Sequence, residues 1–285
     1  MRASLSLLLV CLVARPGAAQ DARPLRYAPR TGTVVHTLFN SRVSLVYRDV
    51  TGGVTATDSV VGEYTALGAV GQRVIDGSTT PRALDVRLDS LRTRARLVGQ
   101  AWKETALSDS LRPTMRVMVD ERLRLGPMPP AGSSQVGLVR SFGWMGIEFP
   151  EEAVAPAGRW TTRAVARLPR ELAALHEVEM PDSLDVIQSV VLDSISARGT
   201  DTLLYFSFQG SIGPSMVPGR DAGDTASVSL AGAQAGSLIW STAWQSFVSG
   251  ASQTRVRARL RVVSGRGGRE AELLWTVTTR IQVRI

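Results

Sequence analysis

The sequence predicts a mainly β protein with curved antiparallel sheets, arranged as a half-open barrel or a sandwich in two similar halves, with at most one or two short helices. Two observations predict this fold class. Apolar and polar residues alternate over most of the chain, as they do on half-buried strands. Glycine, proline and aspartate recur between the alternating runs, where they favour turns.

The alternation is clearest over residues 254–263. Arg255, Arg257, Arg259 and Arg261 fall on one parity, and we call these four residues the arginine ladder. Successive side chains of a strand point to opposite faces, so the ladder shares one face, whereas a helix would scatter it around its circumference. A glycine-rich turn follows, and the chain returns in a second strand with Trp275 on its apolar side. The C-terminal stretch therefore predicts a β-hairpin.

Residues 1–19 have the pattern of a secretory signal peptide. Arg2 precedes an apolar run at 5–13, and small residues favour cleavage after Ala19. The run is shorter than the roughly 20 apolar residues that a membrane span needs. Cys11 lacks the small preceding residue of a lipidated cysteine. We therefore expect an exported protein, periplasmic or extracellular and peripheral to the outer membrane, that is not transmembrane after leader removal.

The first half of the mature chain, residues 20–126, reads as a series of strands. Residues 20–30 are polar with prolines and predict a lead-in. Between 32 and 50 the alternation indicates two strands, or one long bent strand. Residues 54–67 and 68–76 are further strand candidates because they are rich in Thr, Val and Tyr or alternate between turn signals.

Residues 82–108 are ambiguous between helix and strand. Leu84, Leu88 and Leu91 follow the spacing of an amphipathic helix, yet Leu84, Val86 and Leu88 also alternate. The motif V-x-L-D-S at 86–90 helps to decide, because it occurs again later in the chain.

The second copy of this motif, at 190–194, leads into a strongly β segment at 203–208. If the copies are equivalent, the first is also a strand. We expect Asp89 and Asp193, the aspartates of the two copies, to form turns or bulges through side-chain to backbone hydrogen bonds.

A Pro/Gly-rich joint is predicted at 127–159, followed by the second β-rich half at 160–285. Pro169 opens the best helix candidate, at 169–179. A loop rich in Gly, Pro and Asp is expected at 213–224. The strands of this half are predicted near 185–197, 202–212, 225–231 and 236–248, and in the final pair.

Composition limits the chemistry of the mature chain. The only cysteine lies in the leader, which predicts no disulfide and no thiol chemistry. The formal net charge is +8, and removal of the two leader arginines leaves +6. A positive chain favours anionic partners such as lipid. Nucleic acid is not an expected partner, because the chain is exported and its arginines are not interleaved with stacking aromatics.

Catalytic constellations are not evident in the sequence. His36 lies within a strand pattern, and H-E-V-E around His176 lacks the second histidine of a zinc-protease helix. Asp120 and Glu121 are adjacent on a strand, so they point to opposite faces, unlike a glycosidase pair. The sequence therefore predicts no catalytic residue, no metal site and no cofactor.

Two groups of residues are candidate binding sites. Trp240, Trp244 and Trp275 cluster in the C-terminal region, where they either line a ligand groove or fill the core. The arginine ladder, in turn, either contacts an anionic surface or forms a solvated face that protects a sheet edge.

Short motifs in the joint and at the start of the first half are similar to those of a group of known proteins. Phe149-Pro150 leads through Gly158-Arg159-Trp160, and Gly32-Thr33 opens the first half. This plan resembles uncharacterised exported bacterial proteins with two similar β-rich halves. Their halves look like the half-open sheets of bacterial lipoprotein-carrier proteins, an architectural analogy that transfers no site residue.

Together these patterns predict an exported, non-enzymatic β-rich protein that binds an apolar or anionic component of the cell envelope, either a lipid or another envelope protein. Two alternatives stay open. One is a secreted hydrolase with a loop-borne carboxylate or histidine. The other is a partner-binding module that presents the arginine ladder.

Overall fold

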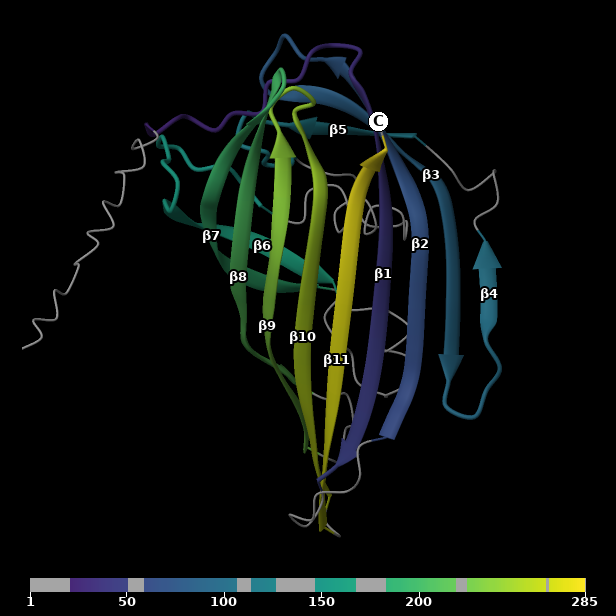
Figure 1. The fold of residues 1–285 in the computed structure, drawn as a ribbon. Helices are drawn as coiled ribbons and strands as arrows, with labels where there is room; N and C mark the ends of the chain where they lie inside the picture. The colour runs from purple at the N-terminus through teal and green to yellow at the C-terminus, as the bar shows by residue number, and fades with distance from the viewer. Residues whose placement is uncertain are drawn as a thin grey trace, which may run out of the picture.

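The computed structural model describes residues 21–50, 59–106, 114–126, 147–167, 183–218, 225–264 and 267–284. Their strands form one antiparallel sheet in the order β4-β3-β2-β1-β11-β10-β9-β8-β7-β6, with β5 paired to β3 (Figure 1). The strands are β1 (Val34–Asp49), β2 (Ser59–Asp76), β3 (Arg82–Leu97), β4 (Lys103–Ala106), β5 (Thr114–Val119), β6 (Arg159–Arg167), β7 (Ser183–Arg198), β8 (Asp201–Pro218), β9 (Thr225–Ser241), β10 (Ser246–Ser264) and β11 (Gly267–Arg284).

The mainly β fold class is confirmed, with a curved sheet that does not close. The described residues contain no helix. The strand interpretation of 82–108 is correct, since this segment contains β3 and β4. The helix expected at 169–179 lies outside the described residues. No helix among the described residues is long and apolar enough to cross a membrane.

Several strands are longer than the sequence predicts. β1 is one continuous strand, which is one of the two alternatives for 32–50, and β2 continues through the boundary between the strands predicted at 54–67 and 68–76. β8 continues to Pro218, so the first part of the loop expected at 213–224 is strand. β9 likewise continues through Gly232 and Gly236, across the interval between the strands predicted at 225–231 and 236–248, but it ends at Ser241, so a turn before β10 divides the second of these predicted strands. These glycines suit a strand interior because neighbouring groups occupy the space of a side chain: the Cζ of Phe208, for example, lies 2.4 Å from where a Cβ of Gly236 would be.

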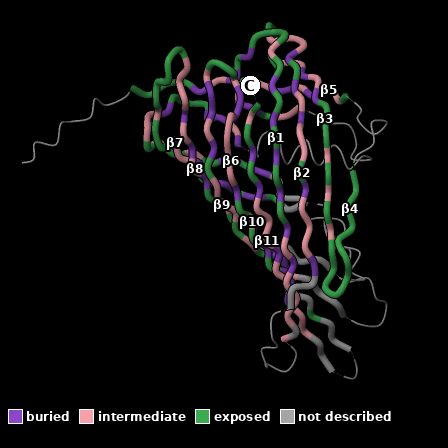
Figure 2. Tube along the Cα trace, turned by 45° about the vertical axis from the view of Figure 1, so that its right-hand side comes forward, coloured by how far each residue is buried: buried purple, intermediate pink, exposed green. Residues whose placement is uncertain are grey.

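Alternation along each strand gives the sheet two different faces. On β1, Phe39 and Val43 are buried, whereas Leu38 and Asn40, the two neighbours of Phe39, are exposed. We call the face with the buried side chains the inner face and the opposite one the outer face. Figure 2 shows this alternation of buried and exposed positions along the strands.

Pairing between β1 and β11 joins the two halves of the chain in a single sheet. The register places Val43 opposite Val277 and continues from His36 to Asp49. The sheet curls about the inner face, so that β5 and β6 lie behind the central strands in Figure 1. Residues from the two ends of the chain therefore lie side by side on each face of the sheet.

One end of the inner face is filled by a large hydrophobic cluster. It contains side chains from β1, β2, β3, β5, β7, β8, β9, β10 and β11, and also Leu25, Tyr27, Ile147 and Phe149 from segments outside the sheet. The lead-in expected at 20–30 is thus part of the core. Burial raises the pKa of the Tyr27 hydroxyl above its usual range, against the opposing effect of the Arg82 guanidinium.

A second, smaller cluster lies elsewhere on the inner face, around Leu45, Val256 and Trp275. Polar side chains also lie on this face. Ser41 and Thr279 face each other across β1 and β11 with their hydroxyl oxygens 3.2 Å apart. The buried amide Nε2 of Gln188 donates a hydrogen bond to Oε1 of Gln234 at 2.9 Å.

The repeated V-x-L-D-S motif forms a β-bulge in both copies. In β3, Ser90 and Leu88 pair with consecutive residues of β2, which leaves Asp89 as the extra residue. In β7, Leu192 and Ser194 do the same against β8, which leaves Asp193. The expected bulges are confirmed, and they bend two strands that each lie one place from an end of the sheet.

Candidate binding site on the outer face

The three tryptophans predicted to bind a ligand lie in three different environments. Trp240 is buried in the large cluster, where its ring packs edge-on against Phe149 and Phe247 at centroid distances of 5.1 and 4.9 Å. Trp275 is buried in the smaller cluster. Trp244 lies in the turn between β9 and β10 and is 37% exposed. They therefore form no common groove, and ligand binding by any one of them stays a prediction.

The arginine ladder lies on the outer face of β10 with all four side chains exposed. Two of its members converge on one acid: Nε of Arg257 and Nε of Arg259 lie 3.2 and 3.5 Å from Oε1 of Glu272. Arg48 approaches the other oxygen of this carboxylate at 3.2 Å. The remaining two ladder arginines have no acidic partner among the described residues. Contact of the ladder with an anionic surface stays a prediction.

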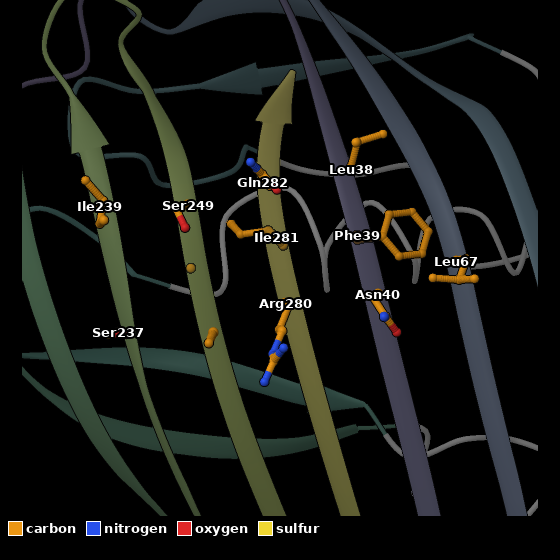
Figure 3. Close-up of a pocket in the computed structure, with 12 residues that line it drawn as sticks. Leu38, Phe39, Asn40, Leu67, Ser237, Ile239, Ser249, Arg280, Ile281 and Gln282 are labelled. Atoms are coloured by element: carbon orange, nitrogen blue, oxygen red, sulfur yellow. The ribbon is translucent and has the colours of Figure 1, made fainter. Parts of the chain in front are cut away.

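A hollow of about 500 Å³ opens on the outer face and crosses β9, β10, β11, β1 and β2 (Figure 3). Leu38 and Leu67 border it on one side, and Ile239 borders it on the other. Arg280 and Gln282 reach into it from β11, between these apolar borders. The hollow thus combines a cation, an amide and exposed aliphatic side chains.

Strand register explains why these side chains meet. Arg280 pairs with Asn40 on β1 and with Ala251 on β10, and Asn40 pairs in turn with Leu67 on β2. Residues directly opposite on neighbouring strands share a face. Ala251, Arg280, Asn40 and Leu67 therefore form one row across four strands, with the cationic side chain near the centre of the row and an apolar side chain at its end.

The depth of the hollow comes from small residues on two strands. β10 contributes only Ser249, Gly250 and Ala251, and β9 contributes Ser237 beside them. The longer side chains of β11 and the border of Ile239 rise on either side of this low floor. A register shift between Phe247 and Ser249 brings β10 into this arrangement.

The electrostatic character of this region is positive. The exposed Arg280 has no acidic partner among the described residues, and the same holds for Arg42, Arg92 and Arg284 on the outer faces of β1, β3 and β11. An arginine guanidinium presents five donors in a planar fork that suits phosphate and carboxylate groups. The region is therefore suited to an anionic group that also carries an apolar portion.

Sequence reasoning did not identify this site. The alternation along β11 does place Arg280 and Gln282 on the face opposite to that of the apolar Ile281, so the sequence alone assigns both to the outer face. Leu38 and Leu67, however, become their neighbours only through the pairing of β1 with β11 and β2. Nothing within the individual strands specifies those partners.

A separate polar cluster surrounds the bulge in β3. Nδ1 of His36 lies 2.9 Å from Oδ2 of Asp89, and Nε of Arg87 donates to Oδ1 of the same carboxylate at 2.9 Å. Gly71 makes this contact possible, because a Cβ there would lie 2.7 Å from Oδ2 of Asp89. At the second bulge, Asp193 instead accepts a hydrogen bond from Oγ of Ser207 at 2.8 Å. Both aspartates bond to side chains rather than to the backbone groups that we expected.

The described part of the chain offers no group of three or more His, Cys, Asp or Glu side chains that could hold a metal ion. His36 is bonded to an aspartate that also binds an arginine, an arrangement that anchors the ring on the outer face. His176, the other histidine considered in the sequence, lies outside the described residues. The site with the clearest capacity for a ligand is thus the hollow around Arg280.

Comparisons with known proteins leave the function open. No protein-family model matches the chain, and no curated protein is similar to it in sequence. Among solved structures, OccK7 (OpdD) of Pseudomonas aeruginosa aligns with 89% of this chain and 100% of its own at 9% identity and a TM-score of 0.22. The COG4313 outer membrane channel of Pseudomonas putida F1 aligns with 93% of this chain and 100% of its own at 11% identity and a TM-score of 0.20. TM-scores this low do not establish a shared fold.

Proposed function

We propose that this protein is an exported, non-enzymatic binding protein that holds an anionic, lipid-like component of the cell envelope in the hollow on its outer face. One observation carries the proposal: an exposed arginine without an acidic partner among the described residues, Arg280, lies beside two exposed leucines, Leu38 and Leu67, in a hollow of about 500 Å³. The leader pattern of residues 1–19 supports export.

The two kinds of lining select for an amphiphile. A phosphate or carboxylate that accepts hydrogen bonds from Arg280 would gain about 1.5–3 kcal/mol, the usual contribution of a bond to a charged group. The apolar part would cover Leu38 and Leu67, whose exposure to water is otherwise unfavourable, at about 25 cal/mol per Å² of apolar surface removed from water. Gln282 and Asn40 add polar groups that can orient the head group.

A purely apolar ligand fits this hollow less well. Such a ligand would displace water from the Arg280 guanidinium without replacing its hydrogen bonds, which carries a desolvation cost. A purely ionic ligand would leave the two leucines exposed. The class of ligand that fits both kinds of lining best is therefore a lipid with one anionic head group.

Calorimetric titration with a soluble short-chain phosphatidylglycerol tests the proposal, with the matching phosphatidylcholine as the neutral comparison. We expect the mature chain to bind the anionic lipid preferentially. Arg280→Gln should weaken that binding by about 10- to 100-fold, because it removes the charge-assisted bond.

Arg255→Gln is the matched control, because Arg255 is also exposed on the outer face without an acidic partner among the described residues, but it does not line the hollow. Its affinity should stay within about twofold of the parent chain. Equal losses in the two variants would reduce the effect to general surface charge, and equal binding of both lipids would contradict the proposal.

A further inference from the structure

We infer that the hairpin between β3 and β4 is an anchor that inserts its tip into the interface of an anionic lipid bilayer. The inference rests on a different part of the molecule from the ligand hollow and does not depend on it. Its residues are Leu97, Val98, Trp102 and Lys103, with Arg94 and Arg96 beside them on β3.

Exposed hydrophobic side chains are concentrated at this tip. Eight large hydrophobic residues of the described chain are exposed, and three of them lie within residues 97–102. Val98 is 66% exposed, the largest fraction of the eight, while Leu97 and Trp102 are 36% and 38% exposed. Single exposed hydrophobic residues are ordinary, but a cluster of them marks an interaction surface.

The tip is held in a defined turn. The amide of Gln100 donates to the carbonyl of Leu97 at 3.0 Å, and Gly99 has φ of +79°. A positive φ at the third residue of a turn is the type II pattern, for which glycine is the favoured residue. Val98 therefore occupies the second position of a closed turn and projects at its apex.

Two arginines fix the indole of Trp102 next to this apex. The guanidinium carbons of Arg94 and Arg96 lie 5.3 and 4.7 Å from the ring centroid, within the range of cation–π attraction. Arg94 in turn pairs with Glu104 at 2.7 Å and Arg96 with Glu63 at 2.6 Å. The ring is thus positioned by residues of three strands, with part of it left exposed.

This combination matches the chemistry of a membrane interface. Tryptophan is enriched there because its apolar ring and polar N–H suit the head-group level. Long cationic side chains extend to anionic head groups while their stems cover apolar surface. Lys103, the only lysine of the sequence, directly follows Trp102. Among the described residues around the tip, three cations (Arg94, Arg96 and Lys103) stand against two carboxylates (Glu63 and Glu104), which gives a positive balance.

A protein partner is a weaker match for the same surface. A stable protein interface buries roughly 800 Å² on each partner, with some 20 or more residues on each side. The tip offers three apolar side chains on a hairpin whose second strand has four residues. An interfacial anchor needs only a few inserted side chains together with electrostatic attraction.

Sedimentation with vesicles tests the anchor. The mature chain should bind vesicles of equal parts phosphatidylcholine and phosphatidylglycerol and should bind pure phosphatidylcholine vesicles much less. Val98→Asp should weaken binding to the anionic vesicles by about tenfold or more, because it places a charge at the inserted apex. Trp102→Ala should weaken it as well, by a smaller factor.

Two variants serve as matched controls. Ile187→Asp changes a residue on β7 that is 58% exposed, and Trp244→Ala changes a tryptophan that is 37% exposed in another turn. Both should keep vesicle binding within about twofold, since neither lies on the hairpin. Circular dichroism of each variant checks that the sheet is intact.

Absence of vesicle binding by the parent chain, parental binding by Val98→Asp, or equal loss in Ile187→Asp would overturn the inference. Arg280→Gln separates it from the ligand site: this variant should lose binding to the soluble short-chain lipid but keep its hold on vesicles. Val98→Asp should show the reverse pattern.

Discussion

The inner and outer faces of the sheet use the same strands for different purposes, and β9 shows the difference within one element. Its inner positions Leu230, Leu238 and Trp240 are almost completely buried. The intervening outer positions include Ala231 and Ala233, which face arginines of β10 across the strand pair. The inner face of β9 consists of closely packed large side chains, whereas its outer face presents small side chains next to charged ones. We therefore expect stability to depend on the first face and binding on the second.

The largest contrast should come from two tryptophans on opposite sides of this division. Trp240→Ala should lower the free energy of unfolding by about 3–5 kcal/mol, because it opens a cavity between Phe149 and Phe247. Trp244→Ala should change it by about 0.5 kcal/mol or less. Urea unfolding of both variants measures the difference. Similar losses would mean that the turn between β9 and β10 is as tightly packed as the core.

The alternation that distinguishes the faces is local, and this is why the fold class was predictable. The parity of Arg255, Arg257 and Val256 specifies a strand without any knowledge of its partners. The bulges at Asp89 and Asp193 were predictable for a similar reason, since the same short motif produces the same backbone feature twice.

Features that depend on distant residues were not predictable. Leu25 and Tyr27 lie in a proline-containing segment without a regular pattern, yet tertiary packing buries both in the core. The hollow depends on the register of five strands, so Leu38 and Arg280 carry no shared signal in the sequence. A register is a long-range property, and a shift by one residue would exchange the two faces.

The outer face also contains one position where charge should matter to stability. Glu272 has a side chain only 4% exposed and faces Arg48, Arg257 and Arg259. Glu272→Gln should lower the free energy of unfolding by about 2 kcal/mol, because it removes the charge that these arginines share.

The matched control is Glu104→Gln, which breaks the pair with Arg94 between side chains that are both about half exposed. It should cost about 0.5 kcal/mol. Chemical unfolding at low and high salt measures both variants, and salt should reduce the loss from Glu104→Gln by the larger fraction, because buried charge pairs are screened less than exposed ones. A loss at Glu272 no larger than at Glu104 would mean that burial of the carboxylate adds nothing.

Adjacent residues of β9 give the sharpest test of the two faces. Gly236→Ala should cost about 1–3 kcal/mol, because the new Cβ would lie 2.4 Å from both the Phe208 ring and the Ala251 carbonyl oxygen. Ala235→Ser, one residue earlier on the outer face, should change stability by about 0.5 kcal/mol or less. Thermal unfolding of the pair checks this, and equal effects would show that the inner face tolerates added volume.

The smallest net effect is expected from a double substitution on the inner face, at the hydrogen-bonded glutamines Gln188 and Gln234. Gln188 is fully buried, and its Nε2 donates to Gln234 Oε1 while its own Oε1 has no partner among the described residues. Gln188→Leu alone should cost about 1–3 kcal/mol, because it leaves the Gln234 oxygen without its donor. Replacing both glutamines with leucine removes donor and acceptor together, and the double variant should lie within about 1 kcal/mol of the parent chain. Unfolding of the two single variants and the double variant forms a complete mutant cycle. If the double variant were the least stable of the three, the amide pair would contribute to stability beyond one hydrogen bond, and packing alone would no longer describe the inner face.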